Sequence, residues 1–169
     1  MNRSCLCAIA IAIAIAIALT LTGCGSRNPR VATTLNNGAV LKGELPVDPL
    51  GWRVITSGIN PADATMSTLF GNDSAVEYCR TRGGRIYPAG SVLSLVTWRQ
   101  QEDSRWFGAR IPAQPRSVEV VKVEVSENAR TNYVYQDFEG VPLREVRVPA
   151  ARADERVMHL LSQRAAVMP

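Results

Sequence analysis

The sequence predicts an α+β fold, in which an antiparallel β-sheet packs against one internal helix and one C-terminal helix. Short stretches of alternating or continuous apolar residues, typical of strands, recur between residues 51 and 148. Two other stretches place apolar residues at helical spacing, one inside this region and one after it. Short turns join the strand stretches, and strands joined so closely pair most simply in the antiparallel direction.

Ahead of the fold, the chain carries the pattern of a secreted lipoprotein. Residues 6–21 form an apolar run, mostly alternating Ala and Ile, behind a short and weakly positive start. This run is typical of a signal peptide, because a membrane-spanning helix needs about 20 apolar residues and usually has stronger charged flanks. Leu21-Thr22-Gly23-Cys24 follows directly and resembles a bacterial lipobox, in which the cysteine thiol accepts a diacylglycerol. We therefore expect residues 1–23 to be removed and Cys24 to be acylated.

Acylation would anchor the protein to a membrane, because each buried methylene contributes about 0.8 kcal/mol and several acyl chains make attachment effectively permanent. Gly25 follows Cys24, so the Asp that retains Gram-negative lipoproteins in the inner membrane is missing. We therefore expect the protein in the cell envelope, facing the periplasm, at the outer membrane rather than the inner one. The alternative is that Cys24 is one more cysteine of the leader, like Cys5 and Cys7.

The rest of the chain divides into a tether and one domain. Residues 24–45 begin with a small, polar stretch that suits a flexible tether, and residues 46–169 are the predicted domain. Its ordered part is expected to begin between Val31 and Pro46. The formal net charge is +4 at pH 7, and the basic residues are dispersed. Such a charge distribution does not predict a nucleic-acid partner.

Three strands are predicted in the first part of the domain. Residues 51–57 and 65–70 are short strand candidates, and the turn-rich residues 58–61 separate them. A turn at residues 87–90 leads into a nearly continuous apolar run at residues 91–101. Such a run predicts a central strand that is buried on much of both faces.

The internal helix is predicted over residues 72–82. Asn72 or Asp73 can cap its N-terminus, and Gly83-Gly84 supplies the stop. Cys79 falls on the apolar face of this helix, so we expect a buried structural thiol. The alternative is a redox or ligand role, because arginines nearby in the sequence supply the positive setting that reactive cysteines need.

The second part of the sheet is predicted from three further stretches. Residues 117–126 alternate, but Val120 and Val121 are adjacent, so we expect a bulge or a sharp twist there. Residues 131–138 and 143–148 are joined by a hairpin-like turn and should pair in the antiparallel direction.

The C-terminal helix is predicted over residues 153–166. Acidic residues lie in its first turn, where they suit the helix dipole. Its apolar face, which would pack on the sheet, consists of Val157, Leu160, Leu161 and Ala165.

Three sequence stretches, in order, carry a family resemblance. They read TMSTLFGNDSAV, YPAGSVLSLVTW and WFGARIP. In this order they resemble the cytochrome P-460 family, and the resemblance covers about residues 50–138. The resemblance implies an antiparallel sheet with helices on one side, commonly a homodimer, and a covalent haem held by a Cys-x-x-Cys-His motif near the C-terminus.

The haem-attachment motif that the family uses has no counterpart in these 169 residues. The corresponding C-terminal region has one histidine, His159, and no cysteine. We therefore expect no covalent haem, and we expect His159 to be a surface residue. The alternative is that His159 ligates a non-covalent haem. A structural zinc site is not expected, because such a site normally needs four Cys or His ligands.

An aromatic group lies near the end of the predicted central strand. Trp98, Trp106 and Phe107 could line a pocket for a small apolar ligand, or for haem as in the haem-bearing relatives. The other interpretation is that these side chains fill an ordinary core, because buried aromatics dominate cores.

The sequence therefore predicts a lipid-anchored periplasmic protein that acts as a binding or structural module without covalent haem. No nucleophile elbow, P-loop, dinucleotide fingerprint or metalloprotease helix is present in the sequence, so an enzyme is not favoured. The alternative function is that of a non-covalent haem protein that handles small nitrogen oxides or oxygen species.

Overall fold

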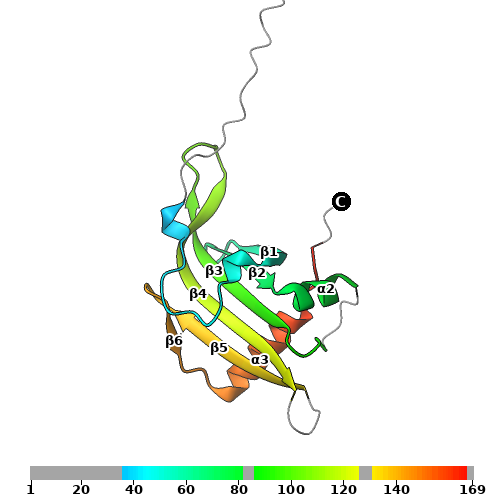
Figure 1. The fold of residues 1–169 in the computed structure, drawn as a ribbon. Coiled ribbons are helices and arrows are strands. Elements are labelled where there is room, and N and C mark those ends of the chain that lie inside the picture. The colour runs from blue at the N-terminus through cyan, green and yellow to red at the C-terminus, as the bar shows by residue number, and fades with distance from the viewer. Residues whose placement is uncertain (1–35, 82–85, 126–130, 167–169) are drawn as a thin grey trace, which may run out of the picture. The chain divides into compact units, whose positions relative to one another are not determined.

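The computed structural model describes residues 36–81, 86–125 and 131–166. Its centre is a six-stranded antiparallel sheet in which every strand pairs with the next one along the chain, as Figure 1 shows. The strands are β1 (Arg53–Asn60), β2 (Thr65–Gly71), β3 (Val92–Glu102), β4 (Arg110–Val125), β5 (Thr131–Glu139) and β6 (Arg144–Val146). The remaining elements are the helices α2 (Asp73–Thr81) and α3 (Ala150–Ser162) and the 3₁₀ turns η1 (Asn37–Ala39) and η2 (Pro49–Gly51). The predicted α+β class is confirmed.

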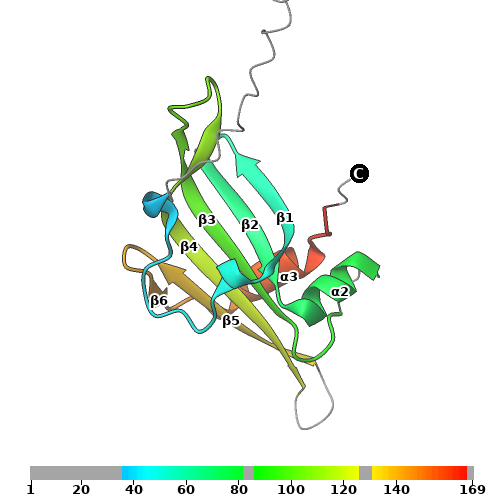
Figure 2. The ribbon, with the colours of Figure 1, turned by 45° about the horizontal axis from the view of Figure 1, so that its top comes forward.

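The two helices cover one face of the sheet, which we call the helix face (Figure 2). Both contribute buried side chains to a single apolar cluster with the strands beneath them. The cluster comprises Ile55, Leu69, Ala75, Val76, Cys79, Tyr87, Leu93, Val121, Val123, Val157, Leu160 and Leu161. The predicted apolar face of the C-terminal helix is therefore confirmed for its three large residues.

The opposite face is covered by residues 36–52, and we call it the arm face. Its buried cluster comprises Phe70, Val96, Trp98, Val118, Val120, Phe138 and Leu143. Side chains of the arm, among them Leu41, Leu45 and Trp52, pack against this cluster. Residues 36–45, which the sequence assigns to the tether, therefore lie against the sheet as part of the domain.

Strand β4 is buried on both faces in its middle. Val118 and Val120 belong to the arm face, while Val121 and Val123 belong to the helix face. The prediction of a bulge at Val120 and Val121 is wrong, because β4 pairs with both neighbouring strands without a break there. Successive residues of this central strand point to opposite faces, and both faces are buried. Adjacent positions can therefore both be valine without a bulge. In the pairing of β4, the register shifts lie instead between β3 and the proline-containing start of β4.

Several element boundaries differ from the prediction for identifiable reasons. Strand β1 continues through the predicted turn to Asn60, because it pairs with β2 over its whole length. Helix α3 begins and ends earlier than predicted: the carbonyl of Pro149 accepts the first helical bond, and the N–H of Ala166 bonds to the carbonyl of Ile55 at 2.8 Å. That bond to the edge of the sheet holds the chain after α3 in an extended form.

The cap of the internal helix is confirmed. The Asn72 side-chain oxygen accepts hydrogen bonds from the N–H groups of Ala75 and Val92, both at 3.1 Å. One side chain thus caps α2 and fixes it to the start of β3. The predicted glycine stop at Gly83-Gly84 lies outside the described residues. Within the described ranges, no helix has the length and apolar character needed to cross a membrane.

Candidate functional site

Helix α3 has two different halves. Its second half seals the helix face with Val157, Leu160 and Leu161, whereas its first half carries Arg152 and Arg156 over the strands. Between this first half and strands β2 to β5 lies an open cavity of about 430 Å³, which we call the polar groove. Its charged and polar lining includes Asp63, Arg116, Glu119, Tyr135, Asp137, Glu139, Arg152, Arg156 and His159.

Glu119 and Arg156 form the firmest contact in the groove. Arg156 donates from Nε and Nη2 to the two carboxylate oxygens of Glu119, each at 2.7 Å, and the Tyr135 hydroxyl donates to the same carboxylate at 2.7 Å. The hydrogen bonds to Glu119 raise the pKa of Arg156, so the guanidinium stays charged. Burial first, and then the bond to Glu119, raises the pKa of Tyr135 above its ordinary value, so the phenol stays protonated. This triad fixes α3 to the centre of the sheet.

Asp137 is the unusual residue of the groove. It lies directly opposite Glu119 on the neighbouring strand and is only 5% exposed. No described residue donates a hydrogen bond to its Oδ1. Burial, and then the negative charges of Glu119 and Glu139, raise its pKa to about 6. A buried carboxyl without a partner is costly unless a ligand or solvent supplies one, so Asp137 is available to a hydrogen-bond donor in the groove.

Two arginines bring positive charge to the same cavity. Arg116 extends from β4 and Arg152 from α3, and both line the groove. Among the described residues, neither lies within ion-pair distance of a carboxylate. Besides the Glu119–Arg156 pair, the groove therefore offers two guanidinium groups and the carboxyls of Asp63, Asp137 and Glu139, of which Asp137 is the buried one. Its volume lies within the range of about 300–1,000 Å³ that small-molecule sites occupy.

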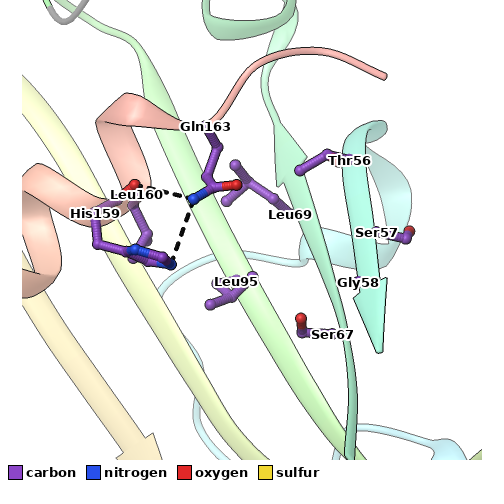
Figure 3. Close-up of a pocket in the computed structure, with 9 residues that line it drawn as sticks. All are labelled: Thr56, Ser57, Gly58, Ser67, Leu69, Leu95, His159, Leu160 and Gln163. Carbon is purple, nitrogen blue, oxygen red and sulfur yellow. Dashed lines mark hydrogen bonds between the residues drawn. The ribbon is translucent and has the colours of Figure 1, made fainter. Parts of the chain in front are cut away.

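His159 is exposed, at the junction of the polar groove with a smaller cavity of about 100 Å³ under the end of α3. Figure 3 shows the ring beside Gln163, whose Nε2 lies 3.4 Å from the ring Nε2 and 3.4 Å from the His159 carbonyl oxygen. Leu69 and Leu95 form the floor of the smaller cavity. The expected surface position of His159 agrees with this placement.

The three aromatic residues of the predicted pocket are not brought together. Trp98 is 6% exposed on the arm face, where its indole N–H donates to the Ala39 carbonyl at 2.9 Å. It borders an apolar groove of about 460 Å³ with Ile59 and Met66. Trp106 and Phe107 are instead exposed in the loop between β3 and β4. Trp98 is thus a filled-core residue with one edge on a surface groove.

Cys79 also lies where the sequence predicts. It is 6% exposed, on the helix face, with its Sγ 3.2 Å from the Tyr87 hydroxyl and 3.5 Å from the Gln163 carbonyl. Burial raises the pKa of Tyr87 well above its usual range, so the phenol stays protonated beside the thiol. Within the described part of the chain, no group of three or more His, Cys, Asp or Glu residues is placed to hold a metal ion.

His159 and Trp98 do not form two walls of one haem pocket. The cavity beneath His159 is about 100 Å³, below the range for small-molecule sites, and on its other side the ring borders the polar groove. His159 belongs to the helix face and Trp98 to the arm face, so the two cannot border one haem. Cys79 is buried in the helix-face cluster and is not placed for a thioether bond.

Glu119 and Asp137 were missed by the sequence reasoning. One signal was present: both acids fall in step with residues that face the helices, Glu119 with Val121 and Asp137 with Tyr135. What the sequence alone could not supply is the pairing register that sets the two acids opposite each other, or the arginine that reaches them from α3.

The family model for cytochrome P460 matches residues 50–155 of the chain. The matched region includes β1 to β6 and the start of α3, and hence the groove lining except Arg156 and His159. No curated protein matches the chain. The match contains the whole stretch 50–138 whose motifs carry the resemblance.

Proposed function

Because the chain belongs to the cytochrome P460 family, we propose that it has kept the family's fold but uses the polar groove to bind a small polar molecule, without covalent haem. The protein acts as a lipid-anchored binding module of the cell envelope. The observation that carries the proposal is the buried Asp137 carboxyl, which lacks a hydrogen-bond donor and faces a cavity that two arginines also line.

The chemistry of the lining defines the ligand class. Asp137 suits an amine or another donor, while Arg116 and Arg152 suit a carboxylate or a similar anion. A small zwitterion satisfies both ends at once. The Glu119–Arg156 pair makes its bonds within the protein, so it holds the groove open rather than contacting the ligand.

The absence of covalent haem is proposed from the chemistry of attachment. Haem is the usual cofactor of the family, and the thioether link needs two cysteines followed directly by a histidine. These 169 residues contain no such motif, and His159 is preceded by Val157 and Met158. The size of the cavity beneath His159 also supports the proposal.

The membrane anchor is proposed from the leader sequence. An apolar run, small residues and Cys24 occur in the order that a lipobox requires, and Gly25 favours the outer membrane. Growth with a radioactive fatty acid tests it: wild-type protein should be labelled, and Cys24→Ser should lose the label. Equal labelling of the two forms would refute acylation at Cys24.

The groove is tested by thermal unfolding of the wild-type protein with free lysine, glycine and glutamate as probes. A zwitterion that binds should raise the unfolding temperature in a saturable way. Asp137→Asn and Arg152→Gln should each abolish that shift, whereas Glu124→Gln, an exposed change on β4 outside the groove, should leave it intact. A saturable shift that survives both groove substitutions would place the ligand elsewhere.

A further inference from the structure

The hairpin between β3 and β4 presents two aromatic side chains to solvent. Trp106 is 68% exposed and Phe107 is fully exposed. The hairpin extends beyond the rest of the sheet, because β2 pairs with β3 only as far as Arg99 and β5 pairs with β4 only from Ser117 (Figure 1). A projecting hairpin with exposed aromatics marks an interaction surface rather than a core.

The loop is ordered by its own bonds. The Asp103 carboxylate accepts hydrogen bonds from the Arg105 backbone N–H at 2.9 Å and from its Nε at 3.0 Å, and the Asp103 N–H donates to the Ala109 carbonyl at 3.0 Å. Arg110 pairs with Glu102 at 3.4 Å. Both arginines of the tip are thus matched by acids, and the tip presents aromatic surface with its charges paired.

The chain enters the domain at the base of this hairpin. The Asn36 side chain donates to the Pro112 carbonyl at 2.6 Å, and the Trp98 indole bonds to Ala39 in the next turn. From Pro112 to Phe107, through the start of β4 and the loop, the chain can span at most about 17 Å. The stretch from Cys24 to Asn36 can span at most about 40 Å. A lipid on Cys24 would therefore keep the hairpin tip within reach of the bilayer surface.

Resting on the proposed acylation of Cys24, we infer that the β3–β4 hairpin is a second membrane contact, with Trp106 and Phe107 inserted at the lipid interface. Tryptophan suits this region because its ring is apolar and its N–H can meet the polar headgroups. Since the arginines of the tip are paired, the contact depends on apolar burial and not on anionic lipid. Two contacts at one end of the domain would orient the protein on the membrane and leave the polar groove free.

The test uses the full acylated protein, purified in detergent and reconstituted into phosphatidylcholine vesicles that contain brominated acyl chains, which quench nearby tryptophan. Wild-type protein should be quenched, and Trp106→Phe should lose most of that quenching. Trp52→Phe is the matched control: Trp52 lies on the arm, and its loss should leave the quenching in place. The result should be the same at low and high salt and with added phosphatidylglycerol.

Fatty-acid labelling of the same preparations separates the two proposals. Labelled protein without Trp106 quenching would overturn the hairpin contact and leave the anchor standing. Unlabelled protein with Trp106 quenching would refute the anchor alone. If the hairpin instead joins two copies of the chain, Trp106→Ser with Phe107→Ser should convert a dimer to a monomer in sedimentation and quenching should be absent, which would also overturn the membrane contact.

Discussion

The two faces of the sheet are closed by different kinds of chain. The arm face is covered by residues 36–52, which carry two short 3₁₀ turns and pack on Phe70, Trp98 and Phe138. The helix face is covered by regular helices, and α3 seals only part of it. Where α3 turns its arginines to the sheet, the polar groove remains open.

The difference explains why the proposed binding site is the polar groove and not the arm face. An apolar surface can be closed by almost any segment that brings apolar side chains, because the hydrophobic effect is not directional. Two carboxylates on neighbouring strands, directly opposite each other, require specific partners, and within the described ranges only Glu119 is paired with an arginine. The helix face is therefore where buried charge opposes stability, and where the proposed binding site lies.

The largest expected effect is on the arm face. Phe138→Ala should lower the free energy of unfolding by about 4 kcal/mol, because Phe138 is 3% exposed and its loss leaves a cavity under the arm. Urea unfolding at pH 7 measures the change. Val125→Ala, at a 58% exposed position on β4, should cost less than about 0.5 kcal/mol. Similar losses for the two variants would contradict the filled arm-face core.

The helix face should respond nearly as strongly to the loss of a charge. Arg156→Met should cost about 3 kcal/mol, because it leaves the buried Glu119 carboxylate with Tyr135 as its remaining donor. The control is Arg110→Met, which removes the exposed pair with Glu102 and should change stability by about 0.5 kcal/mol at most. The comparison fails if both arginines can be removed at equal cost.

Asp137→Asn should act in the opposite direction and stabilise the protein by about 3 kcal/mol at pH 7. The folded state raises the pKa of Asp137 from 3.8 to about 6, so it binds the proton more tightly than the unfolded chain. The stability that the protonated carboxyl contributes is fully present below about pH 4 and is lost as the pH rises through 6. Each unit of pKa shift corresponds to about 1.4 kcal/mol.

Urea unfolding at several pH values between pH 4 and pH 8 tests the direction of this pH dependence. The wild-type protein should lose stability across that range relative to Asp137→Asn. Glu124→Gln should follow the wild-type slope, because Glu124 is exposed. A substitution that destabilises the protein at pH 7, or that keeps the wild-type slope, would show that the carboxyl of Asp137 is not held unpaired in the groove.

The smallest effect is expected at Cys79. Cys79→Ala should cost about 1 kcal/mol through lost packing, because this thiol of α2 packs against Tyr87 in the helix-face cluster. A thiol reagent should label the native protein only after unfolding. Rapid labelling of the folded protein would favour the alternative redox role.

The parts of the molecule that could be predicted are those that local pattern encodes. Asn72 caps its helix, Cys79 lies on an apolar helix face, and Val157, Leu160 and Leu161 pack on the sheet, all from spacing alone. The predicted bulge at Val120 and Val121 was wrong, because a strand that is buried on both faces also lacks the alternation of apolar and polar residues. The groove could not be predicted, since it depends on the Glu119–Asp137 register and on Arg156, far away in the sequence.

The central claim, that this P460 domain holds a polar groove rather than a haem, is tested most directly by titrating haem into the purified protein and into His159→Ala. We expect no Soret band in the protein as isolated, and weak binding that does not saturate and is the same in both forms. His159 is exposed, so its substitution should not alter folding. A Soret band that saturates at one haem per chain and disappears in His159→Ala would contradict the account and establish a non-covalent haem protein.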